Sequence, residues 1–169
     1  MNLNPKAGTR EWVRNYVEGY KIGEVREITA AYAWECVKLS AEGAARFSGD
    51  MGFPQPRSAL LHLLELRRAL DGADAVPQML REILALFDCG QKEYAHDEGD
   101  AFANFKRIGK EIGIAARQVL WVYALKHRDG IQAYMDGHKS QREDVRGRIN
   151  DLYVYCILDI AMNAAQGIE

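Results

Sequence analysis

The sequence has few cysteines and no dominant charge. Cys36, Cys89 and Cys156 are odd in number, lie far apart and form no C-x-x-C motif or Cys/His ligand spacing. This pattern argues against a disulfide framework or a structural zinc site, so we predict that all three are reduced core residues. The formal net charge of -2 leaves no basic footprint, and we therefore expect no nucleic acid partner.

Long hydrophobic runs are also missing. The N-terminal MNLNPKAGTREW has no apolar signal-peptide core, and no run approaches the roughly 18 apolar residues of a membrane span. We expect neither export nor membrane insertion, and the cytoplasm is the default location. At 169 residues, 48% hydrophobic and 27% charged, the chain is long enough for one domain with a sizeable core.

Helical periodicity is the main pattern that the sequence does contain, and strand-like alternation is weak. The predicted elements are a helix over 24–47, a Gly- and Pro-rich linker over 48–57, helices over 58–70 and 77–94, a polar loop over 95–104, and helices over 115–135 and 144–165. They predict an all-α helical bundle, with residues 1–57 as an N-terminal helical arm and linker and 58–169 as the bundle domain.

Two segments carry more apolar surface than a small monomer readily buries. The helix over 58–70 is rich in leucine, and VLWVYAL at 119–125 is apolar on every side. We therefore expect the chain to form a homo-oligomer.

Three polar clusters interrupt these apolar helices, where an unpaired charge costs free energy. They are KEYAHDEGDAFANF (92–105), KHRDGI (126–131) and EDVRGRINDLYVY (143–155). Grouped acids suit Mg²⁺ or Mn²⁺, and a nearby lysine or arginine would offset phosphate charge. The clusters therefore favour a site for a divalent metal and a phosphate.

Each cluster also has an interpretation that needs no ligand. One stripe of the last helix carries Asp144, Arg148, Asp151, Tyr155 and Asp159. Such a stripe is either a ligand-binding face or a solvated face with an i to i+4 Asp–Arg pair.

Single residues in these clusters have ordinary structural explanations as well. Ser140 and Glu143 have the spacing of a capping box, which would make Glu143 a helix-start residue. Lys126 and Asp129 have the spacing of a surface ion pair. His127 is more typical of a packed or surface histidine than of a metal ligand, because no second histidine lies at ligand spacing.

Taken together, the three clusters resemble a known family. The run KEYAHDEGDAFANFKRIGKEIGI (92–114) is similar to the "DYA, acidic loop, F-x-NF, then GI" signature of phage and prophage MazG-like all-α nucleoside triphosphate pyrophosphohydrolases. KHRDGI is similar to their K-H-x-D-x-I element, and EDVRGRINDLYVY to their E-x-x-x-G-R-I-x-D-x-x-x-Y element. The resemblance covers about residues 77–165 in consistent order.

The resemblance implies a helical bundle, as a homodimer or homotetramer, that binds Mg²⁺, or Mn²⁺, and cleaves a (d)NTP between its α and β phosphates. The implied metal ligands are Glu93, Asp129, Glu143 and Asp151, with Asp144 as the reserve for Glu143. Lys126 and Arg148 would be catalytic residues that offset phosphate charge. The implied nucleotide-binding residues are Tyr94, Asp97, Asp100, Phe102, Asn104 and Tyr155.

The sequence departs from the family pattern in two places, which keeps other functions open. The E-E-x-x-E helix of typical MazG proteins is absent, and Glu93 stands where an aspartate is expected. One alternative is a nucleotide-binding or sequestering protein without hydrolysis. Another is a helical protein-interaction module, with anchors at Trp12, Tyr16, Tyr20 and Trp34.

Overall fold

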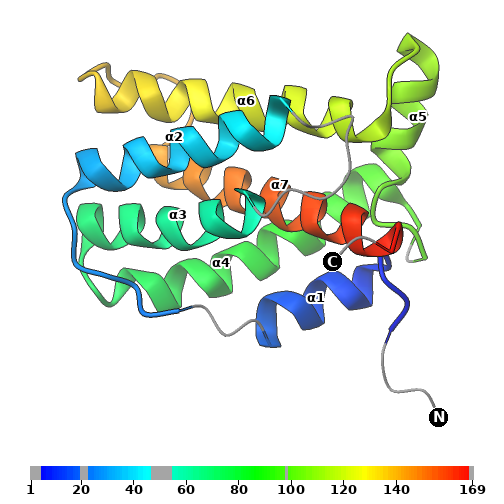
Figure 1. Cartoon of the computed structure of the whole chain (residues 1–169), viewed down its shortest axis with the longest axis horizontal. Coiled ribbons are helices and arrows are strands. Elements are labelled where there is room, and N and C mark those ends of the chain that lie inside the picture. The colour runs from blue at the N-terminus through cyan, green and yellow to red at the C-terminus, as the bar shows by residue number, and fades with distance from the viewer. Residues whose placement is uncertain (1–4, 20–22, 47–54, 98, 168–169) are drawn as a thin grey trace.

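The computed structural model describes residues 5–19, 23–46, 55–97 and 99–167. This part of the chain contains helices and no strands, so the predicted all-α class is confirmed. The elements are α1 (Arg10–Gly19), α2 (Ala30–Arg46), α3 (Gln55–Asp71), α4 (Ala75–Gly90), the π-helix η1 (Gln91–Ala95), α5 (Ala103–Ile112), α6 (Ala116–Met135) and α7 (Val145–Ala165). Figure 1 shows α2, α3, α4, α6 and α7 along the length of the molecule, with α5 across one end.

Helix α7 is the centre of the bundle. It packs against α1, α3, α4 and α6, and Ile149, Leu152 and Cys156 have no exposed surface. A helix that is apolar on nearly every side must be enclosed by others. The buried polar residues of α7, among them Asn150 and Asp159, therefore face neighbouring helices, and each needs a partner.

The close packing of α2 against α3 follows from small side chains. Ala33, Ala41 and Ala44 of α2 are completely buried, and small residues at a contact let two helix axes approach. The indole Nε1 of Trp34 donates a hydrogen bond to Oε1 of Gln132 at 2.8 Å, which joins α2 to α6. These contacts build α2 into the bundle.

The helices of the first 57 residues share one hydrophobic core with the rest of the chain. Val13 and Val17 of α1 and Trp34 of α2 belong to that core, and Arg14 of α1 pairs with Asp88 of α4. These contacts attach α1 and α2 to the other helices, and the domain boundary at residue 57 stays a prediction. Trp34 is only 2% exposed, so it is not available as an anchor for a partner.

Several helix boundaries differ from those predicted. Helix α2 begins at Ala30 rather than Glu24, because the Thr29 hydroxyl accepts a hydrogen bond from the backbone N–H of Tyr32 at 3.2 Å and caps the helix there. Helices α1 and α5 were not predicted. Tyr20 and residues 48–54 of the predicted linker lie outside the described residues.

The apolar segments used to predict an oligomer are largely buried within one chain. Leu60, Leu63 and Leu64 have no exposed surface, whereas Val122 is 63% exposed. Only the second segment therefore still offers apolar surface, and the oligomeric state stays a prediction.

The cysteines divide between core and surface. Cys156 is buried, as predicted, but Cys36 is half-buried and Cys89 is exposed, so the prediction was wrong for Cys89. Among the described helices, none combines the length and the apolar character needed to cross a bilayer.

Candidate metal centre

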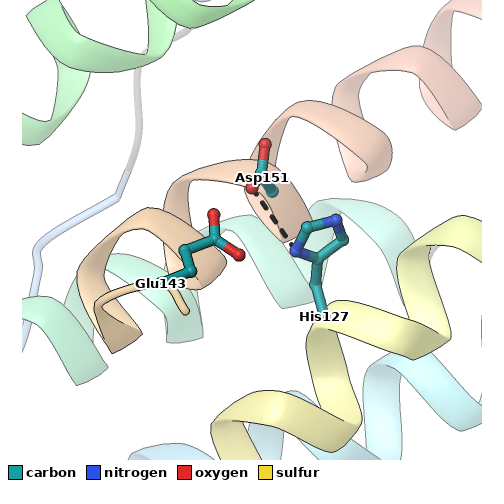
Figure 2. Close-up of side chains that lie close together, drawn as sticks. All are labelled: His127, Glu143 and Asp151. Atoms are coloured by element: carbon teal, nitrogen blue, oxygen red, sulfur yellow. Dashed lines mark ion pairs between the residues drawn. The ribbon is translucent and has the colours of Figure 1, made fainter. Parts of the chain in front are cut away.

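His127, Glu143 and Asp151 form a cluster of three metal-ligand side chains between α6 and the start of α7. One ligand atom from each lies within 4.8 Å of the other two. Nδ1 of His127 is 3.4 Å from Oδ2 of Asp151, and the Glu143 carboxylate points toward both (Figure 2). Within the described ranges, no other group of three such side chains lies this close together.

The start of α7 decides which acid enters this cluster. Asp144 is the N-cap, and its Oδ1 accepts a hydrogen bond from the backbone N–H of Arg146 at 2.8 Å. The predicted capping box with Ser140 and Glu143 is therefore wrong. Glu143 instead folds over Gly147, where a Cβ atom would lie 3.1 Å from Oε1 of the glutamate. Glu143, not Asp144, thus reaches Asp151.

His127 is packed, as predicted, but its ring also faces the two carboxylates. The residue is 8% exposed, and its Nδ1 is buried without a hydrogen bond. Burial lowers the pKa of His127 to about 4, against the opposing charge of Glu143 and with help from Lys126 and Arg148. The imidazole is therefore neutral at pH 7, which is the form that binds a metal.

The pKa of Asp151 is shifted in the opposite direction, upward. Burial is the main cause, with hydrogen bonding to Glu143 and that residue's negative charge after it; against the lowering effect of Lys126 and Arg148, they raise the pKa of Asp151 to about 7. Two carboxylates that share a partly buried site cannot both ionise cheaply. A divalent cation would remove that penalty, because its charge favours both carboxylate anions.

Arg148 lies against the backbone of α6 at Gly130. A Cβ atom at Gly130 would lie 2.6 Å from Cζ and 2.7 Å from Cδ of Arg148, so only glycine leaves room for this side chain. Glycine inside a helix costs about 1 kcal/mol relative to alanine. Nε of Arg148 is buried without a hydrogen bond and lies 4.0 Å from Oε2 of Glu143. The guanidinium is thus held beside the cluster in a long ion pair with Glu143 and without a hydrogen bond to its Nε.

Two of the predicted metal ligands do not join the cluster. The side chain of Asp129 is 67% exposed, and its Oδ1 accepts a hydrogen bond from Nη2 of Arg128 at 2.6 Å. Glu93 is exposed in η1 and hydrogen-bonds with the hydroxyl of Tyr94. The structure brings together Glu143 and Asp151 only, with Lys126 and Arg148 near enough to affect the pKa of Asp151.

Most of the predicted nucleotide-binding residues from the acidic loop lie elsewhere. Asp97 accepts a hydrogen bond from the N–H of Gly99 at 2.8 Å, and Asp100 accepts one from Phe102 at 3.0 Å. Asp100 and Phe102 line a separate cavity of about 590 Å³ that includes none of the cluster residues, and Asn104 is half-buried in the first turn of α5.

Tyr155 is the predicted nucleotide-binding residue that lies beside the cluster. Its ring centroid is 5.6 Å from that of His127. Farther along the stripe on which Arg148, Asp151 and Tyr155 lie, Asp159 is fully buried and binds the guanidinium of Arg117. The stripe predicted from sequence is therefore an interior face of α7 toward α6, except at Asp144.

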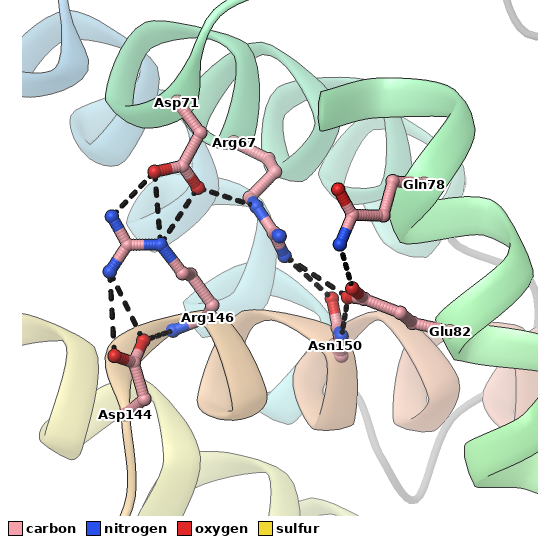
Figure 3. Close-up of polar contacts among 7 residues, drawn as sticks. All are labelled: Arg67, Asp71, Gln78, Glu82, Asp144, Arg146 and Asn150. Carbon is pink, nitrogen blue, oxygen red and sulfur yellow. Dashed lines mark hydrogen bonds and ion pairs between the residues drawn. The ribbon is translucent and has the colours of Figure 1, made fainter. Parts of the chain in front are cut away.

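Another face of α7 carries a second polar network, which joins it to α3 and α4 (Figure 3). Nε of Arg67 donates to Asp71 at 2.7 Å, and Arg146 donates to both oxygens of the same carboxylate at 2.9 Å. Nδ2 of Asn150 donates to Glu82 at 2.9 Å, and Arg67 reaches Glu82 at 3.4 Å. No buried polar side-chain atom of these residues lacks a hydrogen bond, so the network needs no ligand.

Comparisons of this chain with protein-family models, with curated proteins and with solved structures gave no match. The resemblance to the MazG-like family therefore stays a prediction based on the three sequence elements.

Proposed function

We propose that this protein is a metal-dependent nucleoside triphosphate pyrophosphohydrolase that cleaves (d)NTPs between the α and β phosphates. The observation that carries the proposal is the cluster of His127, Glu143 and Asp151, whose ligand atoms lie within 4.8 Å of one another. Three protein ligands are enough to hold one cation and leave positions for water and substrate. The sequence elements that contribute these residues are those that resemble the MazG-like family.

The chemistry of the three side chains indicates which metal ion they would bind. Two carboxylates suit Mg²⁺ and Mn²⁺ equally, whereas an imidazole is an unusual ligand for Mg²⁺. Mn²⁺ therefore fits all three residues, and Mg²⁺ fits Glu143 and Asp151 with His127 beside them. We expect activity with both ions and tighter binding of Mn²⁺.

The side chains around the cluster suit phosphoryl transfer. A bound divalent cation would polarise a phosphoryl oxygen and lower the pKa of a water. Arg148, whose Nε has no hydrogen-bond partner, would donate to a phosphate oxygen, and Lys126 would offset further negative charge. Neutral His127, whose Nδ1 faces Asp151 at 3.4 Å without a hydrogen bond, would use this nitrogen to bind the metal or to accept a proton.

A second function is nucleotide binding without hydrolysis. It is favoured by the positions of Glu93 and Asp129, which leave only Glu143 and Asp151 of the four implied ligands in the cluster of the single chain, with His127 as the third residue. Such a protein would bind nucleotides through Arg148 and Lys126 even when metal is removed.

The proposal is tested by incubating purified protein with each dNTP and with Mg²⁺ or Mn²⁺, and by following pyrophosphate and the monophosphate. We expect turnover that EDTA abolishes and that Glu143→Gln lowers about a hundredfold or more, because a metal ligand is lost. Asp144→Asn, the adjacent acid that points away, is the matched control and should keep activity. Absence of pyrophosphate with every nucleotide and both metals would refute hydrolysis, and nucleotide binding that persists in EDTA would then favour the second function.

A further inference from the structure

A group of aromatic rings extends from the metal-ligand cluster to the protein surface. Tyr155 of α7, next to His127, packs with Phe105 of α5 and Tyr123 of α6, with ring centroids 6.3 Å and 6.5 Å apart. Phe105 is 3% exposed, whereas Tyr123 is 37% exposed. The group is thus buried in the core at Phe105 and exposed to solvent at Tyr123.

Tyr94 is a second exposed aromatic residue near this group. It lies in the π-helix η1, which ends where the backbone N–H of His96 donates to the Gln91 carbonyl at 3.1 Å. His96 adopts the left-handed conformation, with φ of 57°, which is uncommon for residues other than glycine. The π-turn follows α4 directly, and π-turns of this kind occur at helix C-termini.

A side-chain hydrogen bond holds the π-turn in place. The buried side chain of Gln91 donates a hydrogen bond from Nε2 to the Ala101 carbonyl at 3.1 Å, which ties η1 to the residues before α5. Tyr94 is held on this turn with 53% of its surface exposed. A large aromatic residue on a fixed, uncommon turn is suited to binding rather than to packing the core.

Ring geometry connects Tyr123 to the cluster: its ring stacks on that of Tyr155 at 6.5 Å, and the ring of Tyr155 lies 5.6 Å from that of His127. Burial raises the pKa of Tyr155 most, and Asp151, Tyr123, Tyr94 and Glu143 raise it further. The pKa of Tyr94 is raised first by its hydrogen bond with Glu93 and also by Tyr123. Tyr123 therefore lies at the edge of the site that holds Glu143 and Asp151, and Tyr94 is close enough to Tyr155 and Tyr123 to interact electrostatically with this group.

We infer that Tyr94 and Tyr123 form the surface on which the base of the substrate stacks while its phosphates lie toward Arg148. The inference rests on the proposed function and makes its substrate a nucleotide rather than an inorganic polyphosphate. Stacking on an aromatic side chain depends on the π-face that every base has, so it tolerates different bases. The surface should therefore bind purine and pyrimidine nucleotides without strong preference.

The test is calorimetric titration of the full chain, in Mn²⁺, with a non-hydrolysable dNTP analogue and separately with inorganic tripolyphosphate. We expect Tyr123→Ala to weaken nucleotide binding about tenfold, because one stacking contact is lost, and to leave tripolyphosphate binding within about twofold. Tyr123→Phe keeps the ring and should bind like the wild type. Val122→Ala, at a neighbouring residue that is 63% exposed, is the control for general effects on α6.

Equal binding of nucleotide and tripolyphosphate by the wild type would overturn the inference. So would a Tyr123→Ala protein, folded by circular dichroism, that loses both ligands equally or loses neither. If nucleotide binding depends on Tyr123 but the wild type hydrolyses no nucleotide, the proposed hydrolysis fails and the stacking surface stands. If hydrolysis occurs without dependence on Tyr123, the stacking surface fails and hydrolysis stands.

Discussion

Two polar networks meet on α7, and they differ in whether the protein itself completes them. In the network of Arg67, Asp71, Glu82, Arg146 and Asn150, buried donors and acceptors have partners from α3, α4 and α7. In the cluster around His127 and Asp151, Nδ1 of His127 and Nε of Arg148 are buried without hydrogen bonds, and two pKa values are displaced. Buried charge alone therefore does not identify a site.

The incomplete network is the informative one, because buried polar groups in proteins are normally satisfied. A fully paired network holds helices together, whereas an incomplete one keeps unfavourable electrostatic energy that a ligand can release. The comparison predicts that mutations in the first network change stability and that mutations in the second change binding and activity. Each prediction below separates these two outcomes.

The largest expected effect on stability is at Arg67. Its side chain is 5% exposed, and Arg67→Ala would leave Asp71, Glu82 and Asn150 short of a donor. We expect the free energy of unfolding to fall by about 3 kcal/mol, measured by urea unfolding. Arg148→Ala is the matched control and should cost less than about 1 kcal/mol, because its Nε makes no hydrogen bond. Equal losses in the two variants would contradict the distinction between the networks.

A smaller effect, on activity rather than on stability, is expected at Gly130. Gly130→Ala would place a methyl group where the Arg148 guanidinium lies, so the arginine must move away from the cluster. We expect kcat/KM for dNTP hydrolysis to fall about tenfold or more, since a charged contact with the phosphates is lost. The free energy of unfolding should change by less than about 1 kcal/mol, because alanine is the better helix former.

Gly90→Ala is the control for this substitution. Gly90 ends α4, and a Cβ atom there would meet nothing within 4 Å. This variant should keep full activity. A Gly130→Ala protein with unchanged kinetics would show that the position of Arg148 does not matter for the reaction.

The smallest expected effect is on the pH dependence of stability in the metal-free protein. Because the pKa of Asp151 is raised from 3.8 to about 7, the folded state holds a proton that the unfolded chain releases, and this residue makes stability fall as pH rises from about 4 to 7. The pKa of His127 is lowered from 6.5 to about 4, so this residue makes stability rise with pH from about 4 to 6.5. The two contributions oppose each other in the wild type.

Single substitutions should expose each slope. In the Asp151→Asn variant only His127 still titrates, so its free energy of unfolding should increase by about 1 kcal/mol as the pH rises from 4.5 to 6.5, after allowance for solvent screening. In the His127→Asn variant only Asp151 still titrates, so its free energy of unfolding should decrease by about 1 kcal/mol over the same pH range. Urea unfolding at several pH values in EDTA measures both. Parallel pH profiles for the wild type and the two variants would mean that the two groups titrate normally.

The helical class of the protein could be predicted from periodicity, because apolar residues at helical spacing are a local property of the sequence. The limits of α6 and α7 were predicted to within a residue or two for the same reason. Helix α5 and the π-turn before it were missed, since KEYAHDEGDAFANF has the composition of a polar loop. The start of α2 was placed too early because Val25 and Ile28 continue the apolar spacing of the helix, although the helix begins only after the Thr29 cap.

The candidate site was predicted in part. Glu143, Asp151, Lys126 and Arg148 could be placed near one another by resemblance, and the structure brings these residues to one region. His127 was set aside because no second histidine lies at ligand spacing, although its partners come from another helix. Glu93 and Asp129 show that a matching motif does not fix where a side chain lies, because both point away from the cluster in the single chain.

The most direct test of the central claim is titration of metal-free protein with Mn²⁺ by calorimetry at pH 7.5, with Asp151→Asn and Asp144→Asn beside the wild type. We predict saturable binding by the wild type, at least about tenfold weaker binding by Asp151→Asn, and unchanged binding by Asp144→Asn, whose carboxylate caps α7 and faces Arg146. No saturable binding by the wild type, or binding that is the same in Asp151→Asn, would contradict the claim that the incomplete network on α7 is a metal site.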